Sequence, residues 1–279
     1  MSPRVLLAAL LGLGVIGTLL LALGYRNAVA DPVIRRAQVE VADWPAGTPP
    51  VTVLALSDVH VSGPDMPPER LRAVLRRLNG LGADLVLVAG DLVSEKSLAT
   101  RLYPAHDIVS ALSVLEAPMG MIVVPGNHDY WAGIAPFDRA FAEADIPFLK
   151  NTAVRRGPLL IAALNDVHTG NADIAATLLA LDRLGEGPAV LLTHSPDAVP
   201  MLPRQFAAIF VGHTHCGQIV LPVIGALSYA SNHGSRFGCG AIMDGVHRIF
   251  VTAGLGTSIL PLRFGAPPDV WLVTLGPEG

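Results

Sequence analysis

Short apolar runs that end in glycine or polar residues recur along most of the chain. Each run is four to six residues long, which is typical of a strand buried on both faces of a sheet. Alternation of such strands with helices indicates the α/β class. The six clearest runs are Val51–Leu56, Leu85–Ala89, Met121–Val124, Leu159–Ala163, Ala189–Leu192 and Ala208–Val211.

Between these runs, apolar residues repeat at helical spacing. In the clearest case Leu71, Val74, Leu75 and Leu78 lie on one face with arginines between them, which predicts an amphipathic helix between residues 67 and 80. A helix of this kind typically covers one face of a sheet. Further helices are expected at 98–115, 136–144 and 173–184, and later strands at 248–252 and 270–274.

The N-terminal segment differs from the rest because residues 5–23 carry no charge. A helix of roughly 20 apolar residues spans the roughly 30 Å hydrocarbon layer of a membrane. We therefore expect a transmembrane anchor at 1–24, a tether rich in proline and glycine at 25–50, and one catalytic domain at 51–279. Within the tether, the alternating residues 37–41 could form an edge strand.

A cleaved signal sequence followed by export is the alternative reading of this segment, because small residues at 28–30 resemble a cleavage site. The apolar run is longer than a usual signal sequence, which favours an uncleaved, single-pass anchor. Arg4 precedes the run, whereas Arg26, Arg35 and Arg36 follow it. By the positive-inside rule this leans weakly toward a cytoplasmic domain and leaves the side of the membrane open.

Composition excludes several classes of protein. The chain has 279 residues, of which 51% are hydrophobic and 15% are charged, so a disordered chain is excluded. The net charge of −4 comes without any run of lysine or arginine, so nucleic acid is not an expected partner. Cys216 and Cys239 could pair or remain free. We expect a monomer.

Residues that can bind metal follow five of the predicted strands. Open α/β sheets place their sites at the carboxyl ends of strands, so donors from distant parts of the sequence can meet there. Carboxylate, amide and imidazole groups suit manganese, iron or zinc. In chain order these residues are Asp58 and His60, then Asp91, then Asn127, His128 and Asp129, then His194, and finally His213 and His215.

This ordered series, D-x-H, G-D, G-N-H-D, H and G-H-x-H, resembles the calcineurin-like metallophosphoesterase family, from about residue 51 to 275. Neighbouring motifs such as 44–45, 66–69, 217–222 and 254–258 resemble its bacterial subgroup with an N-terminal membrane segment, except that this subgroup commonly has glycine in place of Cys216. The resemblance implies a four-layer α-β-β-α sandwich of two mixed sheets and a site for two divalent cations.

Carried over by position, the family's ligand set gives seven expected metal ligands. Asp58, His60 and His215 would hold the first cation, Asn127, His194 and His213 the second, and Asp91 both. Two cations about 3.5 to 4 Å apart generate hydroxide from water near neutral pH, and this hydroxide would attack phosphorus in line.

Four further residues are candidates for catalysis or substrate binding. The resemblance implies that His128 contacts the substrate, as a donor to the phosphoryl oxygens or as the acid for the leaving group, and that Asp129 orients it. Arg263 and His233 lie in glycine-rich C-terminal stretches, and Arg263 could grip a phosphate with two hydrogen bonds.

The expected function is hydrolysis of a phosphoester or pyrophosphate at the membrane. A lipid-linked substrate fits the anchor, and similar proteins include UDP-2,3-diacylglucosamine hydrolases and, second, general phosphodiesterases acting on soluble substrates. An inactive metal-binding scaffold is the alternative from another class, and the complete ligand set argues against it.

Overall fold

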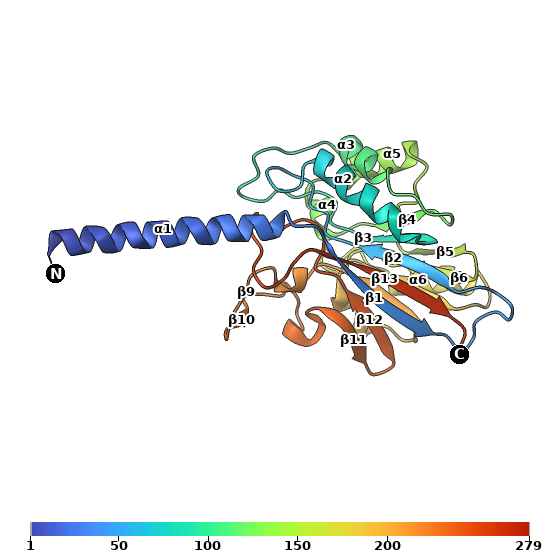
Figure 1. The fold of residues 1–279 in the computed structure, drawn as a ribbon. Helices are drawn as coiled ribbons and strands as arrows, with labels where there is room; N and C mark the ends of the chain where they lie inside the picture. Colours follow the sequence, from blue (N-terminus) through green and yellow to red (C-terminus); the bar gives the residue numbers. More distant parts are fainter. Residues whose placement is uncertain (1, 279) are drawn as a thin grey trace.

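Two mixed sheets form the centre of the computed structural model, which describes residues 2–278 (Figure 1). The first has the order β1-β13-β2-β3-β4 and the second the order β11-β12-β8-β7-β6-β5. The first sheet consists of β1 (Val33–Glu40), β13 (Asp269–Gly276), β2 (Val51–Leu56), β3 (Leu85–Ala89) and β4 (Met121–Val124). The second consists of β11 (Gly240–Asp244), β12 (His247–Val251), β8 (Ala208–Val211), β7 (Ala189–Leu192), β6 (Leu159–Ala163) and β5 (Thr152–Arg156).

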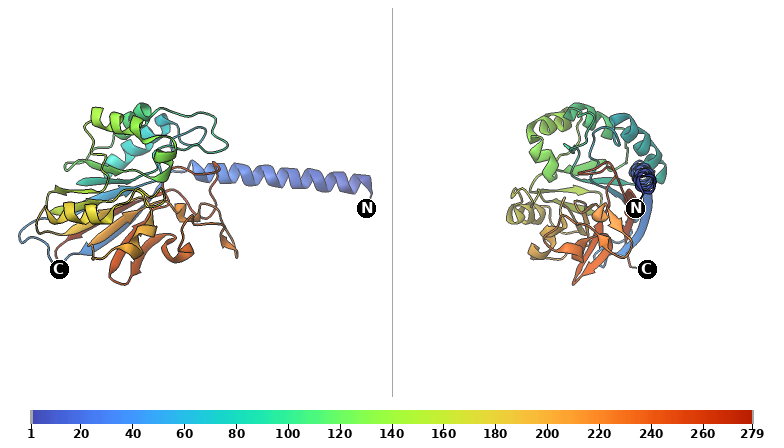
Figure 2. Two further views of the ribbon diagram at one scale, coloured as in Figure 1. Left: turned by 180° about the vertical axis from the view of Figure 1, so that it is seen from behind. Right: turned by 90° about the vertical axis from the view of Figure 1, so that its left-hand side faces the viewer.

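Helices cover the outer face of each sheet (Figure 2). Apolar side chains fill the three spaces between the four layers. Over the first sheet lie α2 (Pro68–Leu78), α3 (Ala105–Leu112) and α5 (Ile134–Glu143), and over the second lies α6 (Ile174–Asp182). Between the sheets, Leu87 and Ile122 of the first share a core with Val190 and Phe210 of the second. Strand residues thus alternate between two apolar layers, which explains why the runs are continuously apolar. The expected four-layer sandwich is confirmed.

Short elements complete the fold. They are the helix α4 (Asn127–Trp131), the hairpin of β9 (Val220–Leu221) and β10 (Gly225–Ala226), and 3₁₀ turns at Asn79–Leu81, Pro196–Met201, His215–Gly217 and Gly234–Phe237. The helix expected at 98–115 is shorter than predicted, because it begins only after Pro104, whose ring fixes the first turn. The sequence pattern also missed the edge strands β5 and β11, which are only partly buried.

Part of the segment expected as a tether is a strand of the domain. All eight residues of β1 pair with β13 in parallel, and Arg35 of β1 forms an ion pair with the buried Asp269. The edge strand expected at 37–41 is therefore present but begins earlier, because the polar side chains of Arg35 and Arg36 disguise its first half. The sheet therefore begins at Val33, before the boundary expected at residue 51.

A single helix, α1 (Pro3–Ala28), extends away from the domain (Figure 1) and is long and apolar enough to cross a membrane. Its last turns contact the domain: the backbone N–H of Arg263 donates to the carbonyl of Gly24 at 3.0 Å, and the Asn27 amide donates to the carbonyl of Arg263 at 3.2 Å. Gly24 packs so closely on Phe264 that a larger residue would displace the ring. The end of α1 is therefore fixed to the loop that precedes β13.

Candidate metal centre

The carboxyl ends of β2, β3, β4, β7 and β8 meet at one edge of the two sheets, and the seven predicted metal ligands lie there, all buried. Within this set, two groups of three have donor atoms that all lie within 4.8 Å of one another: Asp58, His60 and His215, and Asp91, His194 and His213. Residues from distant parts of the sequence thus form one polar cluster.

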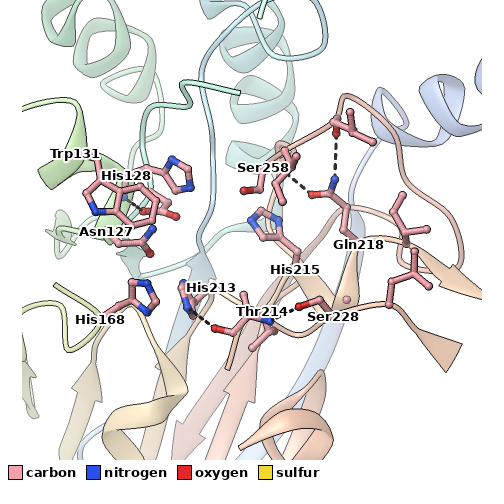
Figure 3. Close-up of a pocket in the computed structure, with 17 residues that line it drawn as sticks. Asn127, His128, Trp131, His168, His213, Thr214, His215, Gln218, Ser228 and Ser258 are labelled. Carbon is pink, nitrogen blue, oxygen red and sulfur yellow. Dashed lines mark hydrogen bonds between the residues drawn. The ribbon is translucent and has the colours of Figure 1, made fainter. Parts of the chain in front are cut away.

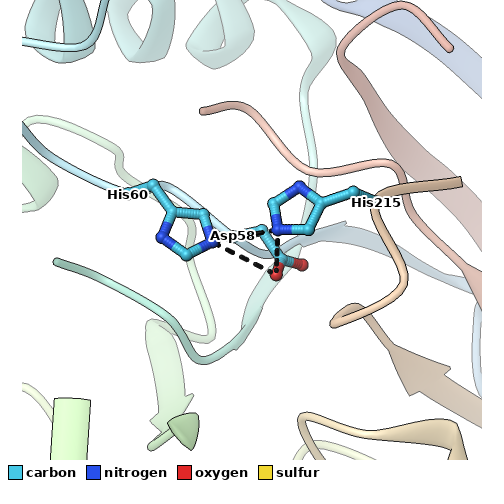
Figure 4. A group of neighbouring side chains, drawn as sticks. All are labelled: Asp58, His60 and His215. Atoms are coloured by element: carbon cyan, nitrogen blue, oxygen red, sulfur yellow. Dashed lines mark hydrogen bonds and ion pairs between the residues drawn. The ribbon is translucent and has the colours of Figure 1, made fainter. Parts of the chain in front are cut away.

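The first group places two imidazoles around one carboxylate oxygen (Figure 4). His60 Nε2 lies 3.0 Å from His215 Nε2, and Asp58 Oδ1 lies 3.3 Å from the same His215 atom. Two nitrogens about 2.1 Å from a common cation and at right angles to each other are about 3.0 Å apart. The spacing of these donors therefore fits one cation.

The second group centres on His194 Nε2. This atom lies 3.1 Å from Asn127 Oδ1, 3.1 Å from His213 Nδ1 and 3.2 Å from Asp91 Oδ2. The same Asp91 oxygen lies 3.6 Å from His60 Nε2 of the first group. Asp91 therefore lies between the two groups, where a ligand shared by two cations would have to be.

Each of the two carboxylates is fixed through one oxygen and presents the other. Asp58 Oδ2 accepts hydrogen bonds from the His213 N–H at 2.9 Å and the Ser57 hydroxyl at 2.6 Å, and Asp91 Oδ1 accepts one from the His128 N–H at 2.9 Å. Asp58 Oδ1 is buried and receives no hydrogen bond from any described residue. Burying a charged oxygen without a partner is costly, and a bound cation would remove that cost.

Backbone carbonyls orient three of the imidazoles. His194 Nδ1 lies 2.7 Å from the carbonyl of Ala89, His60 Nδ1 lies 3.2 Å from that of Val93, and His213 Nε2 lies 2.9 Å from that of Ala230. A carbonyl only accepts, so in each ring this nitrogen carries a proton and the other nitrogen is directed into the cluster. Such partners are typical of histidines that bind metal.

Backbone strain is concentrated in the same residues. Asp58, His60, Asp91, His213 and His215 all have left-handed backbone, with φ between 48° and 68°. This region is unfavourable for residues with a Cβ, and clusters of such residues mark functional sites. The turns after the strands therefore hold these side chains in positions that an unstrained chain would not adopt.

Burial and mutual attraction determine the charges in the cluster. Burial alone would raise the pKa of Asp58, but the neighbouring His215, His60 and His194 together outweigh it and hold that pKa well below its ordinary value. Burial likewise lowers the pKa of His215 well below its ordinary value. For His194, burial lowers the pKa, but Asp91 together with Asp58 outweighs it and raises the pKa of this imidazole well above its ordinary value. A cation that binds there would displace a proton from His194.

His128 lies beside the cluster, whereas Asp129 does not orient it as expected. The carboxylate of Asp129 accepts hydrogen bonds from the backbone N–H groups of Gly126 at 2.9 Å, Leu92 at 2.8 Å and Asp91 at 3.1 Å. It therefore holds the ends of β3 and β4 together and positions Asp91. The expected dyad of His128 and Asp129 is wrong.

The carboxylate that approaches the imidazole ring of His128 is that of Glu95, whose Oε2 lies 3.7 Å from His128 Nδ1. Burial and the neighbouring His60 lower the pKa of His128 to about 4, so the ring is neutral at neutral pH. The imidazole packs edge-on against His60 and against Trp131, with ring centres 4.9 and 4.7 Å apart. His128 therefore lies between the cluster and the exposed Trp131.

Arg263 is not available for a phosphate, contrary to expectation. Its side chain is fully buried, and its guanidinium donates to the backbone carbonyls of Ala253 at 2.7 Å and Ala266 at 3.0 Å. It fixes the loop before β13. His233 is half-buried, packs against Phe237 and does not line the cavity described next. These two predictions failed because exposure cannot be deduced from glycine-rich sequence.

A cavity of about 440 Å³ opens above the cluster (Figure 3). One wall carries Asn127, His128, His213 and His215, and the opposite wall is largely apolar. Two lining residues, Trp131 and His168, were missed by sequence reasoning; Trp131 was detectable because it lies one helical turn after His128. The apolar lining residues are Ile219, Leu227, Ala230, Ile259 and Leu260.

Cys216 and Cys239 form a disulfide. Cys216 directly follows the ligand candidate His215, so the bond ties the turn after β8 to residues that precede β11. The sequence had left open whether the two cysteines pair.

Comparison with known proteins identifies the family. Residues 51–217, more than half of the chain, match the family model described as calcineurin-like phosphoesterase. The chain belongs to the calcineurin-like phosphoesterase family. It is thus a metal-dependent phosphoric ester hydrolase, and its Asp and His clusters suit a site for two metal ions.

Two relatives of this calcineurin-like phosphoesterase are themselves named as metallophosphoesterases, and one solved structure is similar at low identity. The uncharacterized metallophosphoesterase YkuE of Bacillus subtilis is 31% identical over 240 residues, which cover 83% of this chain and 81% of YkuE. A transmembrane protein with metallophosphoesterase domain from Bos taurus is 24% identical over 274 residues. This match covers 91% of this chain and 59% of that protein. The match with the crystal structure of a 5'-nucleotidase precursor from Thermus thermophilus covers 81% of this chain and 55% of that chain. The sequence identity is 13% and the TM-score is 0.47.

Gly212 provides a test of how the fold holds the phosphoesterase site. A Cβ at this position would collide with the Ser57 hydroxyl and the Asp58 carboxylate. Gly212→Ala should therefore displace Asp58, weaken Mn²⁺ binding measured by titration calorimetry, and destabilise the fold by about 1–3 kcal/mol. Gly80→Ala, where a Cβ meets open space, is the matched control. Unchanged Mn²⁺ affinity in Gly212→Ala would contradict the assigned position of Asp58.

Proposed function

We propose that the seven clustered residues bind two divalent cations and that the chain hydrolyses a phosphoester group of a membrane lipid. Asp58, His60 and His215 would hold one cation, and Asn127, His194 and His213 the other, with Asp91 serving both. The observation that carries this proposal is the convergence of buried lone pairs at spacings of 3.0 to 3.6 Å. Manganese, iron and zinc all suit these donors.

Bound cations would supply Lewis-acid chemistry, activating a water and neutralising phosphoryl oxygens. The residues of the chain then orient the substrate. His128 lies on the cavity side of the cluster, and as a neutral ring it can donate a hydrogen bond to a phosphoryl oxygen in the cavity. Trp131 and His168 pack at the same mouth, with ring centres 5.9 Å apart, and limit how the substrate enters.

The cavity favours a substrate with one phosphoester or pyrophosphate group and an apolar substituent. Within residues 2–278, none of the side chains that line it is lysine or arginine. Polyanions such as nucleic acids usually require such cations. The wall formed by Ile219, Leu227, Ile259 and Leu260 would instead contact acyl or prenyl carbons. A lipid phosphate or pyrophosphate fits both halves of the cavity, whereas soluble diesters fit only the polar half.

We further propose that α1 is retained as a membrane anchor and that the domain lies on the exported side. Disulfides persist in oxidising compartments and are rare in the cytosol, which makes the Cys216–Cys239 bond the supporting observation. Arg35 and Arg36, which had favoured a cytoplasmic domain, belong to β1 of the folded domain and carry little weight in the positive-inside rule. An exported domain reaches lipid phosphates of the outer leaflet rather than nucleotide-linked lipids such as UDP-2,3-diacylglucosamine.

Asp91→Asn tests the sharing of one ligand by two cations. An amide in place of this carboxylate should lower kcat on bis(p-nitrophenyl) phosphate with Mn²⁺ by more than about 100-fold, since loss of a ligand's hydrogen-bond partner alone costs about 10- to 100-fold. Asp43→Asn, on the exposed segment before β2, is the matched control. Near-normal turnover by Asp91→Asn would exclude a shared ligand at this position.

His128→Ala separates substrate binding from metal binding. The variant should retain two cations per chain by elemental analysis and lose about 10² to 10³ in kcat, the usual effect of removing one donor to a developing oxyanion. His106→Ala, on the exposed face of α3, should be silent in both measurements. Loss of a cation from His128→Ala would instead make His128 a ligand, consistent with its short distances to His60 and Asp91.

Reporter fusions test the side of the membrane. In the Asp91→Asn background, alkaline phosphatase fused after Gly279 should be active, and green fluorescent protein in the same place should be dark. Green fluorescent protein fused before Met1 is the control and should fluoresce. A fluorescent C-terminal fusion, together with free Cys216 and Cys239 thiols in non-reducing lysates, would place the domain in the cytosol.

A further inference from the structure

Large apolar side chains are exposed at the mouth of the cavity. Val223 at the tip of the β9–β10 hairpin is fully exposed, and Ile224, Leu227 and Ile259 are 72, 62 and 70% exposed. Leu227 and Ile259 also line the cavity, so the exposed surface continues into its apolar wall. Single exposed apolar residues are ordinary, whereas a contiguous group around a cavity indicates a binding surface.

The topology places this surface and the end of α1 on the same side of the domain. β1 is parallel to β13, and β13 is antiparallel to β2. The chain that leaves α1 therefore enters the sheet at the edge where β2 ends and delivers Asp58. Figure 1 shows the β9–β10 hairpin at the side of the domain from which α1 extends, and the view from behind in Figure 2 agrees.

Hydrogen bonds connect the surface to α1. Arg263, whose backbone binds Gly24 of α1, adjoins Phe264, whose carbonyl accepts from the Val220 N–H of β9 at 2.8 Å. Gln218, just before β9, donates to the carbonyl of Leu260 at 3.0 Å and accepts from the Ser258 N–H at 2.9 Å (Figure 3). The hairpin and the 258–262 loop therefore keep a fixed position relative to the helix.

Two more exposed apolar residues, from another part of the chain, lie near the end of α1. Leu98 and Leu102, in the loop after β3, are 56 and 58% exposed. This loop is hydrogen-bonded to Gly63 through the backbone of Thr100 and Arg101, and the hydroxyl of Tyr25 in α1 donates to the carbonyl of Pro64 at 3.2 Å. Apolar loops from two segments thus border the end of the helix.

We propose that these loops, 98–102, 223–227 and 259–260, form a second membrane-contact surface that inserts into the interface of the bilayer crossed by α1. The lipid bilayer is the occupant that fits, because α1 fixes the direction of the membrane and the loops face it. The cavity would then open directly into the headgroup layer. This inference concerns the orientation of the domain and holds whether or not the hydrolysed substrate is a lipid.

Quenching of tryptophan fluorescence by brominated lipid tests the depth of the surface. The full chain carrying Val223→Trp is reconstituted in dioleoylphosphatidylcholine vesicles with or without bromine on the acyl chains. The matched control is Val246→Trp, which is 57% exposed on the turn before β12, at the end of the sheet opposite the site. We expect quenching beyond the wild-type level for Val223→Trp and wild-type quenching for Val246→Trp.

Equal quenching of the two variants would overturn the proposal. A second copy of the chain as the occupant of this surface would also overturn it, and would be recognised if Val223→Trp escaped quenching only after crosslinking to that copy. Hydrolysis provides a separate measurement. Ile224→Asp should keep wild-type turnover of soluble bis(p-nitrophenyl) phosphate and lose quenching when combined with Val223→Trp. Asp91→Asn tests the proposed hydrolysis separately. It should lose activity on the soluble ester, and when combined with Val223→Trp it should leave the quenching unchanged.

Discussion

The structure depends on one electrostatic constraint: several buried oxygen and nitrogen atoms, all with lone pairs, point at each other across about 3 Å. His60 Nε2 and His215 Nε2 are 3.0 Å apart, and His194 Nε2 is 3.1 Å from Asn127 Oδ1. Lone pairs at such distances repel unless protons or cations lie between them. The backbone carbonyls that fix the imidazoles, the hydrogen bonds that hold one oxygen of each carboxylate, and the left-handed turns all maintain this arrangement.

Much of the fold and of this site could be predicted from the sequence because both depend on local patterns. Strands buried between two layers, such as Leu85–Ala89, read as continuous apolar runs, and their donors follow directly in the sequence. Features that depend on three-dimensional surroundings were not predictable. Asp129 binds backbone N–H groups of a neighbouring turn, and Arg263 is buried by a loop that joins α1. The edge strand β1 was expected only at 37–41, inside a tether, because polar residues such as Arg35 and Arg36 hide its first half.

The metal-ligand candidates and the end of α1 lie at the same edge of the sheets, so the proposed chemistry and the proposed membrane anchor are neighbours. Since β1 begins where β2 ends, α1 leaves the domain beside the metal centre, and the apolar wall of the cavity continues into exposed loops. The disulfide next to His215 braces this region and is suited to an oxidising compartment. With α1 retained in a bilayer, as proposed, this arrangement would let the site reach substrates at the membrane surface without moving.

Crystals of the full chain grown with Mn²⁺, measured at a wavelength at which manganese scatters anomalously, test the central claim most directly. The account predicts two anomalous peaks per chain. One should lie among Asp58, His60 and His215, the other among Asn127, His194 and His213, and Asp91 Oδ2 should contact both. A single peak, or peaks outside this cluster of residues, would contradict the two-cation centre on which the proposed function rests.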